Sequence, residues 1–382
     1  LVFGENVQDA THVHIWNPSA EREAVAESAD MLPGRAELPA EPPEGARALP
    51  IEARHERTLL VGASTGAVGR GVAVIWVENE AGLSEPMIVN DTPLDDRDAG
   101  LTALGGRRVL LTWFTRDTRE SLPGVRGQYG EAAEREWQAV LACHDDELVS
   151  RWIGSWIRLS EDGGRTWGEM IRVPVNTPHG PARLGNGDLL YMGNRRNLTP
   201  DWRCLPLEVI RSRDGGRTWT TLGTVPPGEG TENANLVEPH LVECPSGRLV
   251  GLIRYIHHGD SRNHLHFSLL QTESDDGGAT WTPARPLDIY GSPPHLLVHS
   301  SGALVCVYGY RQAPFGQRAM LSRDDGRTWD ADYVVRDDGP GYDLGYPSSV
   351  ELADGGILTV YYQPRTAGEK CALLWTRWRL PP

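Results

Sequence analysis

The sequence lacks the features that mark several large classes of protein. Basic residues are in the minority, with 37 Lys and Arg against 52 Asp and Glu, which gives a formal net charge of −15. A surface that binds nucleic acid or an anionic membrane needs an excess of Lys and Arg, so neither partner is expected. No stretch of the sequence approaches the roughly 18 consecutive apolar residues of a membrane-spanning helix.

Cysteine is also scarce and irregularly spaced. The five residues are Cys143, Cys204, Cys244, Cys306 and Cys371, an odd number without CxxC or metal-ligand spacing. This pattern favours buried free thiols over a disulfide framework, and we expect no metal and no cofactor. No signal peptide is visible, but the chain begins at Leu1, so the natural N-terminus could be missing. We expect a soluble protein, and the sequence leaves open whether it is secreted or cytoplasmic.

Glycine and proline are abundant, with 43 and 28 residues, as expected for an all-β protein with many turns. An internal repeat supports this interpretation. Ser160-Glu-Asp-Gly-Gly-Arg-Thr-Trp167 recurs at 212–219, 274–281 and 322–329, and all four copies fit Ser-x-Asp-x-Gly-x-Thr-Trp. Asp can bond the backbone of a hairpin turn, Gly can adopt a positive φ, and Trp can pack between neighbouring sheets.

The four copies resemble the Asp-box, or BNR repeat, of the sialidase superfamily. The resemblance implies a six-bladed β-propeller in which these boxes lie on the outside, away from the active site. It therefore predicts the fold and assigns no chemistry to the boxes themselves.

Apolar hairpins around Gly turns recur between the boxes and define six units. We predict a single domain over 1–382, with blades at about 46–90, 97–172, 177–222, 236–285, 290–334 and 343–380. A strand near 11–16 is expected to complete the last blade and close the ring. The helical pattern that starts at Glu131 predicts a short insertion in blade 2, either a decoration or a wall of the active site.

Polar and ionisable residues stand just before the hairpins, where the innermost strand of each blade begins at the central funnel. They should converge on one pocket although they are distant in sequence, and we interpret them as an active site. These segments are Asp95-Asp96-Arg97-Asp98, Pro178-His179-Gly180, Glu238-Pro239-His240, Pro294-His295 and Gly345-Tyr346-Pro347.

The resemblance assigns roles to several of these positions. Sialidases use a Tyr nucleophile paired with a Glu, and three Arg that bind the substrate carboxylate. Tyr346 and Glu238 match the nucleophile and its partner, and Arg254 matches one Arg. Arg318, with Arg311 as a competing choice, and Arg47 are the candidates for the other two.

The acid/base position departs from the family pattern. The family Asp normally lies in the loop after the second strand of the first blade, and here the segment from Ala63 to Arg70 contains no acid. Asp95, Asp96 or Asp98 would have to replace it, and we select Asp96 or Asp98. Arg97 is counted with the substrate-binding residues.

Three histidines occupy equivalent inner-strand positions, at His179, His240 and His295. They could contact substrate or act as acid or base, could satisfy hydrogen bonds at crowded strand ends, or could bind a divalent metal. We select His179 as a catalytic candidate and His240 and His295 as substrate-binding candidates.

These residues together predict a glycoside hydrolase that removes a terminal acidic sugar from an oligosaccharide or glycoconjugate, with exo-α-sialidase as the specific form. Two alternatives remain. One is a His- and Tyr-dependent lyase or hydrolase acting on uronic-acid-type glycans. The other is a carbohydrate-binding propeller without catalytic activity.

Overall fold

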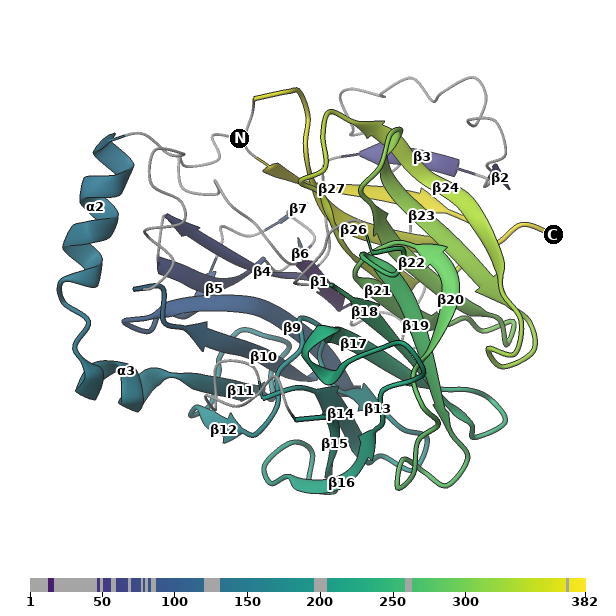
Figure 1. Ribbon diagram of the computed structural model, residues 1–382, viewed down its shortest axis with the longest axis horizontal. Helices are drawn as coiled ribbons and strands as arrows, with labels where there is room; N and C mark the ends of the chain where they lie inside the picture. Colours follow the sequence, from purple (N-terminus) through teal and green to yellow (C-terminus); the bar gives the residue numbers. More distant parts are fainter. Residues whose placement is uncertain are drawn as a thin grey trace.

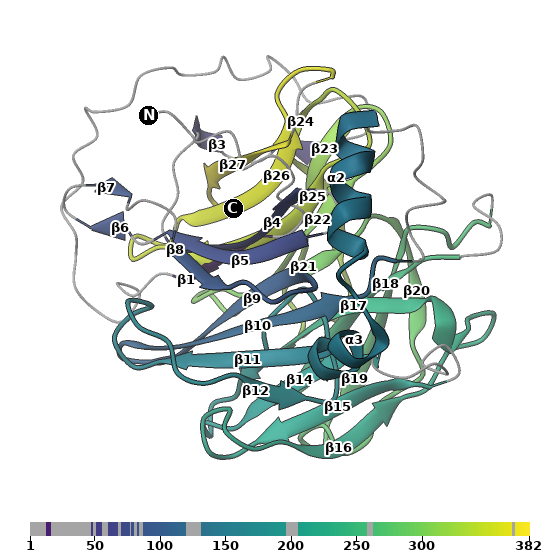
Figure 2. The same ribbon diagram turned by 90° about the vertical axis from the view of Figure 1, so that its left-hand side faces the viewer.

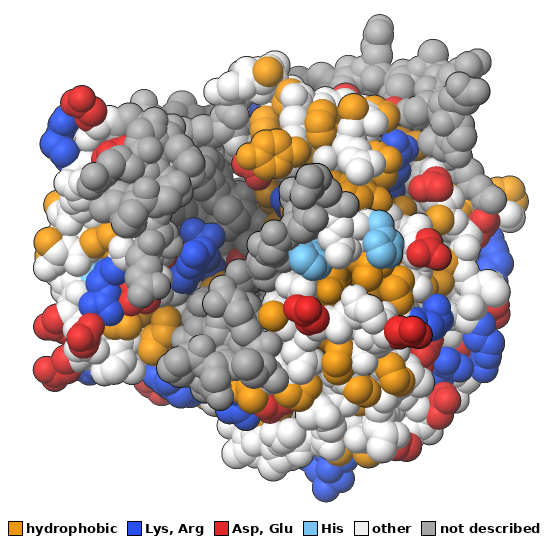
Figure 3. Space-filling model, viewed as in Figure 1, with side chains coloured by type: hydrophobic (Ala, Val, Ile, Leu, Met, Phe, Trp, Pro, Cys, Tyr) orange, Lys and Arg blue, Asp and Glu red, His pale blue; other side chains and the backbone are white. Residues whose placement is uncertain are grey.

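Antiparallel sheets arranged around a common axis make up the computed structural model (Figure 1). The structure describes residues 13–16, 47–48, 51–55, 60–67, 70–76, 78–79, 82–83, 87–119, 131–195, 205–257, 263–368 and 371–382, with side chains from residue 87 onward. The prediction of an all-β propeller of the sialidase type is confirmed. Acidic and basic side chains are interspersed on the face seen in Figure 3.

Three sheets each use four strands that are consecutive in sequence. The first of them contains β9 (Asp95–Gly105), β10 (Arg108–Arg116), β11 (Gly154–Ser160) and β12 (Ile171–Val173). The next contains β13 (Ala182–Arg183), β14 (Leu189–Gly193), β15 (Leu207–Ser212) and β16 (Thr220–Val225). The third contains β17 (Leu236–Glu243), β18 (Leu249–Tyr255), β19 (Ser268–Ser274) and β20 (Arg285–Tyr290), and the 3-10 helix η3 (Asn233–Asn235) precedes β17.

Two further sheets take their last strand from the N-terminal part of the chain. One contains β21 (Pro294–Val298), β22 (Leu304–Tyr310), β23 (Phe315–Ser322), β24 (Asp330–Gly339) and β2 (Arg47–Ala48). The other contains β25 (Gly345–Glu351), β26 (Ile357–Pro364), β27 (Cys371–Trp378) and β3 (Ile51–His55).

The remaining four-stranded sheet has the order β1-β4-β5-β8. Its strands are β1 (Val13–Trp16), β4 (Leu60–Ala67), β5 (Arg70–Trp76) and β8 (Met87–Asn90). A small separate hairpin pairs β6 (Glu78–Asn79) with β7 (Gly82–Leu83).

The N-terminal strand differs from its prediction. The strand near 11–16 was expected to complete the last blade, but β1 pairs with β4, and β3 instead pairs antiparallel with β27. Residues 47–55, assigned to the first blade, thus extend the last two sheets through β2 and β3. The physical reason is that a strand's alternation fixes which of its faces is apolar but not which sheet edge it joins.

The helical insertion is confirmed, and it lies between β10 and β11. It consists of α2 (Glu131–Leu141) and α3 (Asp146–Trp152), and Figures 1 and 2 show both helices outside the ring of sheets. Asp145 caps α3, because its carboxylate accepts the Leu148 N–H at 2.7 Å. Among the helices within the described ranges, none is long and apolar enough to cross a membrane.

Apolar side chains fill the spaces between neighbouring sheets. The largest such cluster joins the sheets of β14 and β18, where Leu190, Met192, Leu249 and Ile253 are buried. Each strand there is apolar on both faces, because both faces of a propeller blade pack against another blade. This core fixes the inner strands that carry the candidate site.

The four Asp-boxes share one network of hydrogen bonds. In the first, the Asp162 carboxylate accepts the backbone N–H groups of Arg165 and Thr166 at 3.0 and 2.9 Å and the Thr166 hydroxyl at 2.7 Å. Ser160 Oγ donates to the same carboxylate and accepts the Gly164 N–H, where the glycine φ is +84°. The Ser and Thr contacts recur at Asp214, Asp276 and Asp324. The prediction of a closed Asp turn is confirmed.

These turns should make stability fall in acid. The Thr hydroxyl and backbone bonds lower the pKa of Asp162, and of its three counterparts, from 3.8 to about 2; at Asp214 burial opposes this but is outweighed. A carboxyl whose pKa is lower in the folded state stabilises fully above its unfolded pKa, and the stabilisation is lost as pH falls through the folded value. We expect the free energy of unfolding to fall from about pH 4 to about pH 2, and to fall less in Asp162→Asn. Urea unfolding at several acidic pH values measures this, and equal slopes for the two proteins would contradict it.

Candidate active site

Three inner strands share an unusual backbone feature at their first residues. β9, β17 and β25 each contain a bulge, and the residues Asp98, Glu238 and Tyr346 in these bulges have φ values of +56°, +50° and +50°. A positive φ is uncommon for residues other than glycine and costs about 1–3 kcal/mol. Because this strain occurs at similar positions in three blades, we take these three residues as candidates for a functional site.

Tyr346 and Glu238 are joined directly. The Tyr346 hydroxyl donates to Glu238 Oε1 at 2.8 Å, although the two residues are 108 positions apart. Burial, followed by the Glu238 charge, raises the pKa of Tyr346 well above its ordinary value. The phenol is therefore protonated at rest, and its proton already points to a carboxylate that can accept it.

Arg254 completes the cluster from β18. Its Nη1 donates to Glu238 Oε2 at 2.5 Å and to Tyr346 Oη at 2.8 Å. The Arg254 and Glu238 side chains are only 7% and 11% exposed, so the pair is largely shielded from water. Burial alone would lower the pKa of Arg254, but the charge of Glu238 outweighs it and raises the pKa.

A second arginine flanks the same tyrosine. The Arg311 guanidinium lies 5.8 Å from the centre of the Tyr346 ring and 5.8 Å from that of Phe267, and Arg254 lies 5.1 Å from the Phe267 ring. Among the described residues, Arg254 Nε and Arg311 Nε are buried without a hydrogen-bond partner. Buried donors of this kind call for an acceptor that a bound molecule can supply.

Arg318 and Arg47 lie elsewhere. Arg318, the first choice for this position, is on β23 with its guanidinium over the Tyr310 ring at 4.8 Å, and no contact among the described residues joins it to Tyr346. Arg47 is on β2, at the outer edge of a sheet whose inner strand is β21. A strand pattern does not tell an inner from an outer strand, which is why Arg47 was misplaced.

Asp96 and Asp98, the two candidates for the acid/base, have different surroundings in the structure. Asp96 is fully buried and accepts bonds from Asn90 Nδ2, the Thr92 backbone N–H and the Thr92 hydroxyl at 2.7–3.0 Å. It thus closes the turn into β9, and burial raises its pKa to about 7. Asp98 instead acts electrostatically on Tyr346, since its charge is among the causes that raise the pKa of that tyrosine.

Arg97 lies between the two aspartates just described. It donates to Asp95 at 2.5 Å and its side chain is 33% exposed. Burial opposes its charged form, but Asp95, Asp98 and Tyr346 together raise the pKa of Arg97. Arg97 and Asp98 therefore lie near enough to Tyr346 to interact with it electrostatically.

The rings of the three histidines pack against one another, with ring centres 4.6–5.5 Å apart. His240 Nδ1 accepts the Leu296 N–H at 2.9 Å, and His295 Nδ1 accepts the Ser349 N–H at 3.3 Å, so each ring links its own strand to the next blade. Burial lowers the pKa of His240 to about 3. His240 is therefore neutral, and the bonds of His240 and His295 tie neighbouring inner strands together, which favours the structural interpretation for these two residues.

His179 is fully buried, so in this conformation it cannot touch a substrate, contrary to its selection as a catalytic candidate. The rings of His240 and His295 pack against it, with ring centres 4.8 and 5.5 Å away. In the described part of the chain, no three His, Cys, Asp or Glu residues form a metal-binding group.

Two residues near Tyr346 were not found from the sequence. Tyr362 stacks on Tyr346 with ring centres 5.9 Å apart, and its hydroxyl donates to Asp343 at 2.9 Å. The hairpin pattern could have indicated Tyr362, because this residue pairs with Gly345, the neighbour of Tyr346, in the β25–β26 hairpin. Phe267, in the loop before β19, left no such signal.

Comparisons with known proteins agree with this architecture. The family model described as a BNR repeat-like domain matches residues 131–360, more than half of the chain. No curated protein matches the sequence. Among solved structures, a protein of unknown function from Dyadobacter fermentans is 18% identical, with a TM-score of 0.65 over 88% of this chain and 95% of that one.

Two solved enzymes have similar folds. The intramolecular trans-sialidase from Ruminococcus gnavus is 14% identical, with a TM-score of 0.55 over 89% of this chain and 99% of that one. The NanB sialidase from Streptococcus pneumoniae is 12% identical, with a TM-score of 0.58 over 91% and 71%. At these identities the likeness concerns the fold alone.

Proposed function

Because this chain belongs to the BNR repeat-like family of the sialidase superfamily, we propose that it is a glycoside hydrolase that removes a terminal acidic sugar, with exo-α-sialidase as its specific activity. The observation that carries the proposal is the Tyr346 hydroxyl bonded to both Glu238 and Arg254. We also propose that the chain forms a single domain of six blades, in which the sheet β1-β4-β5-β8 is the first blade.

The acidity of the substrate explains the choice of nucleophile. A sugar with a carboxylate beside its anomeric carbon would repel a carboxylate nucleophile, whereas a neutral tyrosine avoids this repulsion. Tyrosine-dependent sialidases are a recognised exception to the two-carboxylate scheme of glycosidases. The buried, unpartnered Nε atoms of Arg254 and Arg311 are suitable donors to that substrate carboxylate.

The reaction has two steps in which protons balance. Tyr346 Oη attacks the anomeric carbon while its proton passes to Glu238, and Asp98 protonates the leaving oxygen as the glycosidic bond breaks. Water then attacks the same carbon with Asp98 as base, the bond to Tyr346 breaks, and Glu238 returns the proton to the phenolate. Arg97 is assigned to substrate binding beside Asp98.

Turnover of aryl α-sialosides and a panel of acidic oligosaccharides tests the proposal, with the released sugar identified by mass spectrometry. We expect a free acidic monosaccharide as the product. Tight binding of intact glycans without turnover would instead indicate a binding propeller. A 4,5-unsaturated product would indicate the lyase alternative, which the burial of His179 disfavours as the base.

Asp98→Asn should separate substrates by their leaving groups. We expect turnover of sugar-linked substrates to fall by roughly 10²–10³-fold, and that of aryl glycosides with acidic leaving groups to fall much less, because these need little protonation. Steady-state kinetics on both substrates measure the difference. Asp96→Asn is the matched control, and we expect its loss of turnover not to depend on the leaving group. If Asp96→Asn showed the same dependence as Asp98→Asn, Asp98 would not be identified as the acid.

A further inference from the structure

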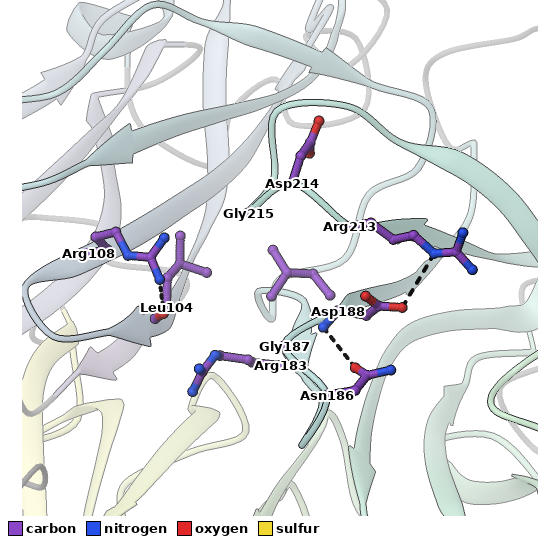
Figure 4. Close-up of a pocket in the computed structure, with 10 residues that line it drawn as sticks. Leu104, Arg108, Arg183, Asn186, Gly187, Asp188, Arg213, Asp214 and Gly215 are labelled. Atoms are coloured by element: carbon purple, nitrogen blue, oxygen red, sulfur yellow. Dashed lines mark hydrogen bonds and ion pairs between the residues drawn. The ribbon is translucent and has the colours of Figure 1, made fainter.

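A concave site lies near the end of β9 that is opposite to Asp98. It is a cavity of about 340 Å³ between the blades of β9–β12 and β13–β16, next to the second Asp-box (Figure 4). Asp98 and Leu104 are six residues apart on β9, so the cavity is roughly 20 Å from the candidate acid/base Asp98 at about 3.3 Å per residue. A single sugar unit cannot reach both.

The cavity is lined by positive charge from two blades. Arg108 comes from the β9–β10 hairpin, Arg183 from β13 and Arg213 from the start of the Asp-box, and all three side chains are exposed. In Figure 4, Arg108 and Arg183 stand on one side of the space and Arg213 on the other. Such a cluster is notable in a chain with a net charge of −15.

The acidic side chains at the cavity do not neutralise this cluster. Asp188 lies 3.7 Å from Arg213, and Asp214 is occupied by the Ser212 and Thr218 bonds of its own box. Within the described ranges, neither Arg108 nor Arg183 forms an ion pair with a carboxylate; Arg108 donates to the Leu104 carbonyl at 2.9 Å, which fixes its position. Two guanidinium groups thus lie at the cavity with donors to spare, and one of them, that of Arg108, is held in place.

The remaining lining suits a sugar. Asn186 supplies an amide and Gly187 leaves the backbone open to a ligand, whereas Leu104 and Leu189 line the cavity but are almost fully buried. Guanidinium groups bind carboxylates bidentately, and a sugar ring adds an apolar face. We propose that this cavity is an accessory binding site for a carboxylate-bearing sugar unit of an acidic polysaccharide, independent of the proposed catalytic activity.

Titration calorimetry with hexagalacturonate as the probe, and neutral cellohexaose as its control, tests the site. We expect hexagalacturonate to bind, cellohexaose not to bind, and Arg108→Gln/Arg183→Gln to weaken the binding by about tenfold or more. The control is Arg323→Gln, which removes one positive charge at the fourth Asp-box, at the position that Arg213 holds in the second, and should change nothing.

Hydrogen exchange locates the bound probe. Slower exchange at 183–188 and 213–216 on addition of hexagalacturonate is the expected result, and unchanged turnover of aryl glycosides in the double variant shows that the fold and the funnel are intact. Protection only in the funnel segments, equal losses of affinity in Arg323→Gln and the double variant, or no binding to the unaltered protein would each overturn the proposal.

Discussion

Replacing Tyr346 with Phe should lower kcat/KM for glycoside hydrolysis by roughly 10³-fold or more while leaving the fold unchanged. The substitution removes only the hydroxyl that Glu238 and Arg254 bind, and the ring remains packed against Tyr362. Without this oxygen there is no atom to form the bond to the anomeric carbon. Kinetics on an aryl α-sialoside, with circular dichroism as a check of folding, measure the effect.

Tyr362→Phe is the matched control. It removes a hydroxyl from the neighbouring stacked ring, where the oxygen bonds Asp343 and lies 3.5 Å from Arg311. This change should cost no more than about tenfold, because Tyr362 acts on the reaction only by positioning. If Tyr346→Phe were as active as Tyr362→Phe, Tyr346 would not be the nucleophile.

Arg254→Met should be the most destabilising single change at the site. It leaves the buried Glu238 carboxylate without its cation, and breaking a buried pair in this way costs about 3–5 kcal/mol. The Arg254 side chain is 7% exposed, so water cannot replace the lost contacts. Urea unfolding followed by tryptophan fluorescence measures the loss in free energy.

A second variant separates loss of charge pairing from loss of packing. Glu238→Gln/Arg254→Met removes both charges, and most of the lost stability should return, because the cost comes from the uncompensated carboxylate. A double variant as unstable as Arg254→Met alone would show that the pair contributes mainly through packing. Neither variant is expected to turn over substrate.

The fold was predictable because its signals are local and repeated. Each Asp-box places its own Ser, Asp, Gly and Thr within one turn, so eight residues contain the whole network. The hairpins between boxes are equally local. The closure of the ring was not predictable. β1 and β3 join sheet edges that are distant in sequence, and their few residues do not indicate which strand they pair with.

The candidate site was predictable in part for a related reason. Residues at the starts of inner strands converge whatever their distance in sequence, which correctly brought Tyr346, Glu238 and Arg254 together. The bulges with positive φ lie at Asp98, Glu238 and Tyr346, and no sequence pattern revealed them. The burial of His179 and the turn role of Asp96 were likewise not visible in the sequence.

Proton NMR of the first product released from a sialoside tests the central claim most directly. Attack by Tyr346 followed by attack of water inverts the anomeric carbon twice, so the sugar should first appear with the configuration of the substrate and mutarotate afterwards. A first product of inverted configuration would mean that water attacks directly. The Tyr346–Glu238 pair would then not be a nucleophile and its base.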